Sequence, residues 1–484
     1  MSSTGKNMSK RRRSRPPSFL TCLIVVVIAT LAAFLWVLWP RPDRTLNGLL
    51  WAVRGGDVAT FKELLADHPE WTKPIAEEPL FLEAAAQMPS PHAAEIAREL
   101  LRRGADPNCA DQVGHAALHW TVFSNNVPVA EALLEASADV DRRGYGGRTA
   151  LHDAALLGRP DVADVLVRHG ANCNAKDDHG SVPLDMAIGG SFKKTPEDCA
   201  RIVESLCSHG ADLGETESGS PYVLLAAEQG NVPVLKVLVA HGAKVNTRDA
   251  HGRTTLFAAF DDGFPRFPKT PERQRAETVE YLASQGADVN VADDKGMRPI
   301  DLAVGRGDML VVETLLRRAA NCNTKDGSKA TPLSMAIGEP AARRLPETSA
   351  RLVELLCSHG ANVSETNRHG ASCLQLAAEC GNVPAMKVLI AHGAQVNARN
   401  TEGQTPIFGA VVFDSHVPAR DRVQAIEYLA SQRADVNATD DKGMHPIDFA
   451  FRNGAKLLVD ALLRCGAKEP APPRKTFGNS EKGP

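Results

Sequence analysis

Apolar residues recur along most of the chain at the spacing of short amphipathic helices. In residues 147–178, which read GRTALHDAALLGRPDVADVLVRHGANCNAKDD, a first helix is followed by a second with an apolar face that includes Val162. Thr149 supplies a hydroxyl N-cap, Pro160 suits a first helical turn, and Gly170 marks a helix end. The pattern predicts two short helices followed by a polar turn rich in Asp and Asn.

This helix-pair pattern repeats with a regular period. The glycine that precedes each pair recurs every 33 residues, and from residue 180 onward every second unit is longer, with spacings of 39, 44, 41 and 40. These positions are Gly114, Gly147, Gly180, Gly219, Gly252, Gly296, Lys329, Gly370, Gly403 and Gly443. Residues 147–295 and 296–442 also match as two blocks of four repeats, since CSHG at 207–210 returns at 357–360.

The period and the text of the units resemble the ankyrin repeat. Helix starts similar to Thr-Pro-Leu-His occur at 331–333 and 405–407, and an end similar to Gly-Ala-Asp-Val-Asn occurs at 286–290. The resemblance covers about residues 79–469, after a divergent unit at 46–78. It implies an all-α solenoid of about 11–12 helix–turn–helix units, each burying its apolar face against its neighbours.

Residues 18–39 form an uncharged apolar segment of a different kind. At ~1.5 Å per residue this segment makes a helix of roughly 33 Å, which is enough to cross a hydrocarbon core of about 30 Å. Basic residues are more numerous before the segment than after it, and Trp36 and Trp39 lie at its end. We expect one transmembrane helix with a cytoplasmic N-terminus and an extracytoplasmic repeat domain, most readily a periplasmic one. A cleaved signal peptide is the alternative, although no small-residue cleavage site follows the segment.

The expected organisation has five parts. They are a basic cytoplasmic segment (1–17), a transmembrane helix (18–39), a linker (40–45), the ankyrin-repeat domain (46–469) and a disordered tail (470–484). The 55 basic and 58 acidic residues give a formal charge of −3, which argues against a polybasic nucleic-acid binder. Ten cysteines in 484 residues are too few for a disulfide scaffold.

No enzymatic motif is present, and the repeats leave no room for a catalytic domain, so we expect no catalytic residue and no cofactor. His169, His209, His241, His359 and His392 recur at helix ends. A metal ladder is one interpretation, but helices spaced about 8–10 Å apart separate the rings too far for bonds of roughly 2.1 Å. These histidines are better explained by helix C-terminal carbonyls, and we expect no metal site.

The four lengthened units should carry their extra residues between the first and second helix, as loops along one edge of the solenoid. Basic and apolar side chains occur together there, which suits an extended acidic partner. Surface loops that are merely tolerated are the alternative. The predicted contact residues in these loops are Phe192, Lys193, Lys194, Phe264, Arg266, Phe267, Lys269, Arg343, Arg344, Phe413, His416 and Arg420.

The resemblance implies a second binding surface, formed by the hairpin tips and the concave helix face. Most tips are acidic, and turn geometry explains their Asp residues equally well. The clearest basic tip carries Arg142, Arg143 and Tyr145, side chains of the kind that dominate binding energy.

The expected function is a non-catalytic scaffold that binds proteins close to a membrane and takes no small-molecule substrate. A passive tether, or a regulatory subunit that anchors an enzyme, remains as an alternative. Ser137, Ala319 and Arg433 replace the glycine that ends a second helix, so each must adopt positive φ or reshape its turn.

Overall fold

The structure is a computed structural model of the 484-residue chain. It describes residues 46–68, 82, 84, 86, 87, 92–189, 194–214, 219–249, 252–260, 270–338, 345–367, 370–412 and 417–469. Regular structure in these ranges is helical, apart from three isolated β-bridges. The chain divides into two compact units, residues 1–139 and 140–484, which we call unit 1 and unit 2 and describe separately.

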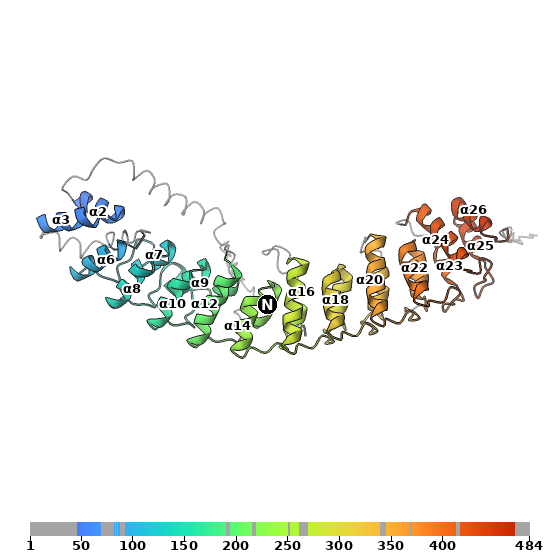
Figure 1. The fold of residues 1–484 in the computed structure, drawn as a ribbon, viewed down its shortest axis with the longest axis horizontal. Coiled ribbons are helices and arrows are strands. Elements are labelled where there is room, and N and C mark those ends of the chain that lie inside the picture. The colour runs from blue at the N-terminus through green and yellow to red at the C-terminus, as the bar shows by residue number, and fades with distance from the viewer. Residues whose placement is uncertain are drawn as a thin grey trace, which may run out of the picture. The chain divides into compact units, whose positions relative to one another are not determined.

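Unit 1 is built from short helices (Figure 1). They are α2 (Leu46–Gly55), α3 (Val58–Asp67), α6 (Ala93–Arg102), α7 (Ala117–Ser124) and α8 (Val127–Glu135). Helix α3 packs on α2 and α6, and α8 packs on α6 and α7. Phe61 on α3 and Ile96 on α6 are fully buried in this core.

Unit 2 is a succession of helix pairs. The helices are η2 (Tyr145–Gly147), α9 (Ala150–Leu157), α10 (Pro160–Arg168), α11 (Pro183–Gly189), α12 (Pro196–Ser208), α13 (Tyr222–Glu228), α14 (Val232–Ala240), α15 (Thr255–Ala258), α16 (Glu272–Ser284), α17 (Pro299–Arg306), α18 (Met309–Arg317), α19 (Pro332–Ile337), α20 (Pro346–Ser358), α21 (Cys373–Glu379), α22 (Val383–Ala391), α23 (Pro406–Gly409), α24 (Ala419–Ser431), α25 (Pro446–Arg452) and α26 (Lys456–Arg464). The predicted helix pairs are therefore confirmed.

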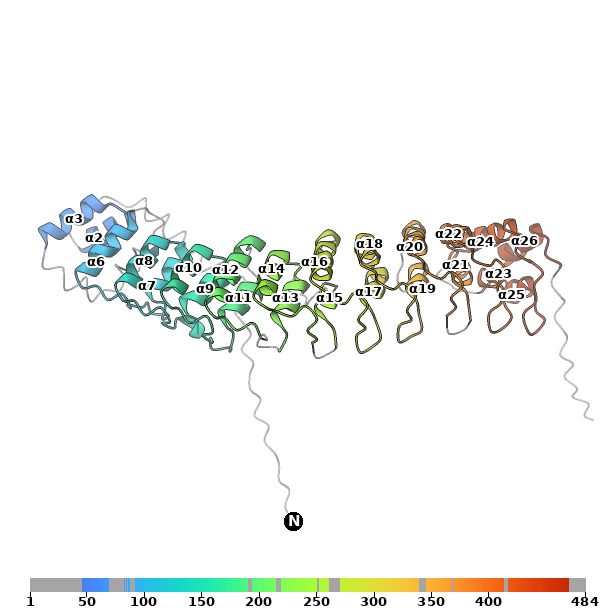
Figure 2. The same cartoon turned by 60° about the horizontal axis from the view of Figure 1, so that its bottom comes forward.

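The pairs of unit 2 stack in two layers. First helices pack on first helices, as α9 does on α11 and α17 on α19, and second helices pack on second helices, as α12 does on α14 and α20 on α22. Within this unit, Figure 2 shows the hairpin loops projecting beyond the layer of first helices. The core lies between the layers, where Leu151, Phe257 and Phe408 have almost no exposed surface. Each pair thus completes its core with its neighbours, as a solenoid requires.

The lengthened repeats differ from the others at two places. Their first and second helices are separated by the extra residues, as the sequence predicts. Their second helices α12, α16, α20 and α24 are also longer, with 13 residues against nine in α14, α18, α22 and α26. Part of the added length therefore extends a helix rather than a loop.

Left-handed backbone positions end the helices. Gly170, at φ +85°, ends α10, and glycines occupy most equivalent positions. Ser137, Ala319 and Arg433 adopt φ of +64°, +64° and +68° at these positions. Of the two outcomes expected for them, the chain therefore adopts positive φ and keeps the turn. Lys329, which replaces the glycine before a pair, behaves in the same way at φ +65°.

In the part of the chain that the structure describes, no helix combines the length and the apolar character needed to cross a bilayer. The predicted transmembrane helix at 18–39 and the predicted tail at 470–484 lie outside the described residues. Both therefore remain predictions.

Candidate interaction surfaces

The basic tip predicted at residues 142–145 lies at the start of unit 2, immediately before α9. The Gly144 N–H donates to the Arg148 carbonyl oxygen at 2.7 Å and closes the turn. Tyr145 begins the 3-10 helix η2, and 61% of its surface is exposed. Arg142 is half-buried, so Tyr145 and Arg143 are the tip's two accessible side chains.

The next hairpin supports this tip. Arg143 donates from Nη2 to the Lys176 carbonyl oxygen at 2.5 Å, and its Nη1 lies 3.9 Å from a carboxylate oxygen of Asp178. Gly147 has φ +71°, and a Cβ there would lie 2.2 Å from the Asp178 carboxylate, so only glycine fits. The tip is therefore held in one conformation before any partner arrives, which lowers the entropy lost on binding.

Among the predicted loop residues, the structure describes only Lys194 and Arg420. Arg420 is exposed in the first turn of α24, where it is available to a partner. The others lie outside the described residues, and their role stays a prediction. They are Phe192, Lys193, Phe264, Arg266, Phe267, Lys269, Arg343, Arg344, Phe413 and His416.

Lys194 has a structural environment rather than an open one. Its Nζ donates to the carbonyl oxygens of Ala155 (3.2 Å), Ala187 (2.9 Å) and Met186, which lie near the C-terminal ends of α9 and α11. Burial lowers the pKa of Lys194 to about 8. The ammonium thus satisfies carbonyls that a helix end leaves without partners, and it links two neighbouring repeats.

Two buried arginines, which are not among the predicted site residues, fix the starts of longer second helices. Arg275 on α16 forms a bidentate pair with Asp308, with Nε–Oδ2 and Nη2–Oδ1 distances of 3.0 and 2.8 Å. Arg422, 147 residues later on α24, donates to the carbonyl oxygens of Val412 (3.2 Å) and Val417 (2.9 Å), on either side of the fourth insertion. The sequence feature that could have identified them is an arginine at the same position in both four-repeat blocks, although the surrounding residues differ.

A row of half-buried apolar side chains follows the first helices of unit 2. Each member occupies the fourth residue of the helix or its equivalent, one position after the residue that matches the family's histidine. The row consists of Met186, Leu225, Leu302, Met335, Leu376 and Phe449. Asp153, Ala258 and Gly409 occupy the same register and are buried. The sequence feature that could have predicted this row is an apolar residue at a position where the solvent-facing side of a helix usually carries a polar residue.

Unit 1 carries an aromatic cluster on and beside α7. The ring of His115 lies 6.0 Å from that of Trp120 and 5.5 Å from that of Phe123, and the Trp120 and Phe123 rings are 5.4 Å apart, all edge to face. Phe123 and nearby Val113 are exposed. Exposed aromatic groups held by other rings are typical of binding surfaces, and this cluster was not predicted.

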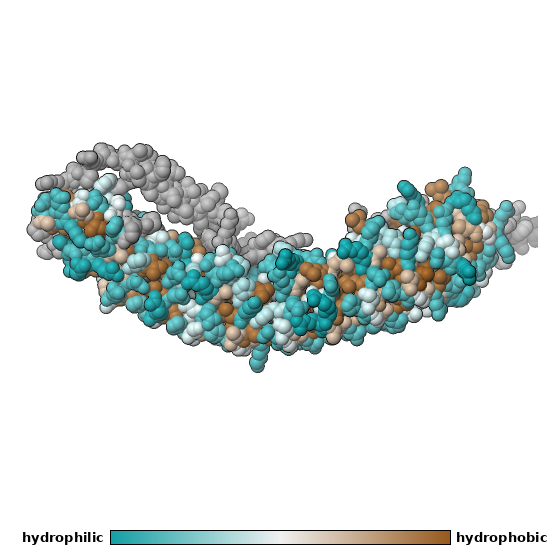
Figure 3. All heavy atoms as spheres, viewed as in Figure 1, coloured by the Kyte–Doolittle hydropathy of each residue, from teal (hydrophilic) through white to brown (hydrophobic). Residues whose placement is uncertain are grey.

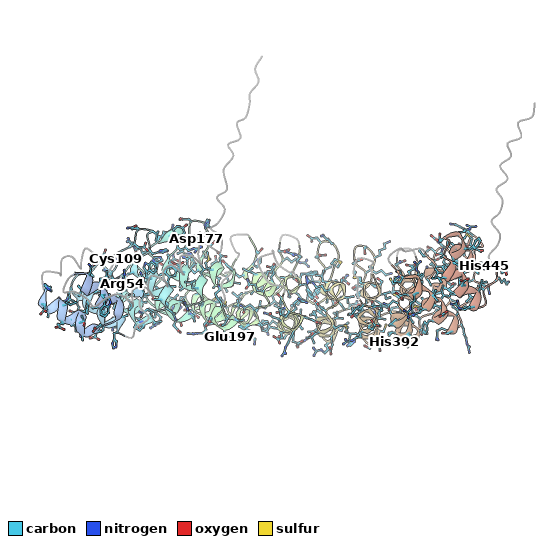
Figure 4. All side chains as sticks on the ribbon, turned by 90° about the horizontal axis from the view of Figure 1, so that it is seen from above. Arg54, Cys109, Asp177, Glu197, His392 and His445 are labelled. Carbon is cyan, nitrogen blue, oxygen red and sulfur yellow. The ribbon has the colours of Figure 1, made fainter. Side chains whose placement is uncertain are left out.

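The acidic residues of the hairpin tips have turn-forming roles. Asp177 Oδ1 accepts from the backbone N–H groups of His179 (2.8 Å) and Ser181 (3.0 Å), and Asp293 and Asp440 repeat this arrangement. Figure 4 shows Asp177 and His445 on the hairpin side of unit 2, with Glu197 and His392 on the side of the second helices. The first carboxylate of each tip is therefore committed to its own turn.

Asparagine side chains connect consecutive hairpins. Asn174 Nδ2 donates to the Gly210 carbonyl oxygen at 2.9 Å, while its Oδ1 accepts from the Asp212 N–H at 2.8 Å. Asparagines at equivalent places make the same two hydrogen bonds to the following hairpin. They are Asn246, Asn290, Asn323, Asn397 and Asn437.

Two of the recurrent histidines bind carbonyl oxygens of their own helix, as expected, whereas His241 and His392 reach Glu204 and Glu354 on the preceding second helix. His209 and His359 bind the carbonyl oxygens of Ser205 (2.8 Å) and Leu355 (2.9 Å) through Nδ1, four residues earlier in each case. His152 has its pKa lowered by burial and bridges two repeats, with Nε2 at 3.1 Å from the Ser181 carbonyl oxygen. Within the described ranges, no three His, Cys, Asp or Glu side chains are grouped so that they could hold a metal ion.

The cysteines that the structure describes form no disulfide with one another. Cys173, Cys322 and Cys373 are buried, and burial raises the pKa of each. A buried, protonated thiol packs as a small hydrophobic group, so these three residues have a structural role.

Comparisons with known proteins point to one family. A family model for ankyrin repeats (3 copies) matches residues 81–177 and 341–440. Inversin from Mus musculus is 27% identical over 263 residues, which cover 54% of this chain and 22% of inversin. The B-cell lymphoma 3 protein homolog from Mus musculus is 29% identical over 237 residues, 48% of this chain and 49% of that protein.

Rabankyrin-5 from Homo sapiens is 25% identical over 258 residues, 49% of this chain and 21% of that protein. The chain thus spans about a fifth of inversin and of Rabankyrin-5, and about half of the B-cell lymphoma 3 protein homolog. The family model, the relatives and the stacked helix pairs agree with the 33-residue period. This chain therefore contains ankyrin repeats, which the family model places at residues 81–177 and 341–440.

Proposed function

We propose that this protein is a non-catalytic scaffold that binds partner proteins close to a membrane. Its ankyrin-repeat relatives support a role in protein–protein interaction. The observation that carries the proposal on this chain is the pre-ordered tip at 142–145, where Tyr145 projects from a turn fixed by backbone hydrogen bonds.

The row of half-buried apolar side chains on the first helices extends the proposed binding surface. Row members such as Met186, Leu302 and Phe449 lie at one register of the first helices, and the row is interrupted only where that register is buried. An extended partner segment would therefore meet an apolar contact at most repeats. Methionine adapts its shape to different partners. The tip would supply a fixed anchor, and the row would supply contact area along the partner.

The proposed membrane attachment rests on the uncharged segment at 18–39 and the basic residues before it. A short linker at 40–45 would hold the repeat domain near the bilayer. The insertion loops would add basic and apolar contacts along one edge.

The test is a crosslinking pull-down from native membranes that compares three variants with the wild type. The tip variant carries Tyr145→Ala. The loop variant replaces the basic loop residues with Glu but keeps Lys194, because its ammonium holds helix ends; it changes Lys193, Arg266, Lys269, Arg343 and Arg344. Arg273→Ala, on the exposed face of α16, is the matched control.

A partner that wild type and the Arg273→Ala variant capture equally, and that the tip variant loses while remaining folded, would support the proposal. Loss in the loop variant alone would move the binding site to the insertions. If no variant captures any partner above background, the passive tether replaces the scaffold. The membrane attachment is tested by measuring how much of the protein stays with membranes stripped of peripheral proteins and how much enters the soluble fraction.

A further inference from the structure

The end face of unit 2, formed by α25 and α26, exposes a position that every equivalent helix pair buries. In the pairs that begin at α9, α13, α17 and α21 this position holds Ala155, Ala227, Val304 and Ala378, none more than 1% exposed. In the last described pair it holds Phe451, which is larger and 49% exposed. A terminal repeat that faces water usually carries a polar outer face.

A second position shows the same difference. Leu463 on α26 is 40% exposed, whereas Leu316, 147 residues earlier on α18, is 7% exposed. Leu457 provides an internal reference, because it and its counterpart Leu310 are both exposed, at 61% and 39%. Leu457 therefore belongs to the ordinary solvent face, and Phe451 and Leu463 belong to the face that a following pair covers. In Figure 3, hydrophobic residues reach the surface over these helices.

The turn between the two helices reveals where a covering helix would begin. A Cβ on Gly158 would lie 2.8 Å from Lys194, and a Cβ on Gly381 would lie 3.0 Å from Asp421, so the start of the next second helix covers each turn. At Gly454, the equivalent glycine, a Cβ would meet nothing within 4 Å. Among the described residues, nothing takes the place that the first turn of a second helix occupies elsewhere.

The helices that cover the equivalent faces share one chemistry. Helices α12, α16, α20 and α24 each have an acidic residue in the first turn and an apolar buried face. Two exposed basic residues border the end face: Lys456 at the start of α26, and Arg452 next to Phe451. The pair 147 residues earlier has the uncharged Met309 and Gly305 at these positions. Apolar contact and opposite charge therefore favour the same kind of occupant.

We propose that this end face binds an amphipathic helix of a partner protein that has an acidic first turn, and that this helix extends the stack as α12 extends it beyond α10. The surface differs from the tip and the apolar row of the proposed function. The same chemistry disfavours a symmetric contact between two copies, because Arg452 and Lys456 would then face one another's positive charge.

The probe is a fluorescent peptide of residues 194–210, with Cys199 and Cys207 replaced by Ala, because it contains α12 and the acidic pair Glu197 and Asp198. Fluorescence anisotropy follows its binding to the full chain in detergent. We expect saturable binding, reduced at least tenfold by Phe451→Asp, and unchanged by the matched control Leu457→Asp.

A charge exchange tests the acidic first turn. A peptide with Glu197→Lys and Asp198→Lys should bind the wild-type chain at least threefold more weakly, and Lys456→Glu in the chain should restore part of that loss. Circular dichroism and an unchanged unfolding midpoint establish that the Phe451→Asp chain is folded.

Three outcomes would overturn the proposal. The first is the absence of saturable binding, or equal binding to the Phe451→Asp chain. The second is a Phe451-dependent dimer in sedimentation velocity, which would assign the face to a second copy. The third is peptide binding that occurs only when residues 470–484 are removed, which would assign the face to the chain's own segment.

Discussion

The buried pair of Arg275 and Asp308 connects two adjacent repeats, and the substitution Asp308→Ala tests how much it stabilises their junction. Both side chains are about one-tenth exposed, and two short hydrogen bonds join them. Alanine is sterically acceptable at this position, because Ala455 occupies it in the last described pair. The expected effect therefore comes from the lost charge and hydrogen bonds rather than from poor packing.

The magnitude follows from two independent arguments. Hydrogen bonds to charged groups contribute about 1.5–3 kcal/mol each, and this substitution removes two of them. Removing one member of a buried ion pair costs about 3–5 kcal/mol, because the other charge stays buried without its partner. We therefore expect Asp308→Ala to lower the free energy of unfolding at this junction by about 3–5 kcal/mol.

Hydrogen exchange measured by mass spectrometry is the suitable assay, because the stability of a solenoid is a sum of local terms. Amides of α16 and α18 should lose roughly two to four orders of magnitude of protection, at 1.36 kcal/mol per decade. Amides of α10, several repeats away, serve as the reference and should keep theirs. The double variant Arg275→Met with Asp308→Leu should stay within about 1 kcal/mol of wild type, since hydrophobic groups often replace such pairs without loss.

Two results would refute this reasoning. A loss of under about 1 kcal/mol for Asp308→Ala would mean that water or another acceptor compensates the Arg275 guanidinium. An equal loss in the single and double variants would mean that packing, rather than the unpaired charge, determines the stability of the junction.

Three further predictions concern the turns, the hairpin links and a buried acid. Ala319→Gly should raise the free energy of unfolding by about 0.5–1 kcal/mol, because glycine adopts φ +64° without strain. The control Ala350→Gly, inside α20, should lower the free energy of unfolding by about 1 kcal/mol. Urea unfolding measures both changes, and two changes of the same sign would contradict the prediction. Asn323→Ala removes two hydrogen bonds to the next hairpin and should reduce hydrogen-exchange protection there by about 1–2 kcal/mol; unchanged protection would show that the amide is dispensable. Burial raises the pKa of Asp153 to about 7, so the folded chain binds this proton more tightly than the unfolded chain does, and stability should fall as the pH rises from about 4 to about 7. Asp153→Asn should remove this part of the slope in pH-dependent unfolding, and an unaltered slope would mean that Asp153 does not titrate in this range.

The helix pairs were predictable because their signals are local. An N-cap, a first-turn proline and a C-terminal glycine act within one helix, and the 33-residue period repeats them many times. The same register identified Ala319 and Arg433 as turn positions that lack glycine, and both do adopt left-handed backbone. Because the same backbone conformation is required in every repeat, a repeat that lacks the glycine can be recognised by comparison with the other repeats of the same chain.

The side-chain partners were not predictable because they depend on folding. Lys194 was expected in an exposed binding loop, since a lysine among turn residues usually faces water. Its long side chain instead reaches the ends of α9 and α11, which only stacking brings together. Whether the remaining loop residues bind a partner is still a prediction, because the structure does not describe them. Arg275 was missed for a related reason: its acidic partner lies 33 residues away on the next pair.

The pattern of hairpin links repeats with the four-repeat block rather than with the single repeat. The asparagine that joins consecutive hairpins is replaced by Gly214 in one block and by Ser364 in the other, at the same place. A pocket lies beside Ser364 and is also lined by Thr366 and Arg399.

On the opposite side of these same two junctions, a histidine joins the second helices. His241 lies 3.0 Å from Glu204, and His392 lies 3.2 Å from Glu354. Both blocks therefore combine an open hairpin side with a linked helix side at one junction, while the other junctions keep the asparagine. Since the open side lacks two hydrogen bonds that its neighbours have, a bend of the stack should concentrate there, once in each block.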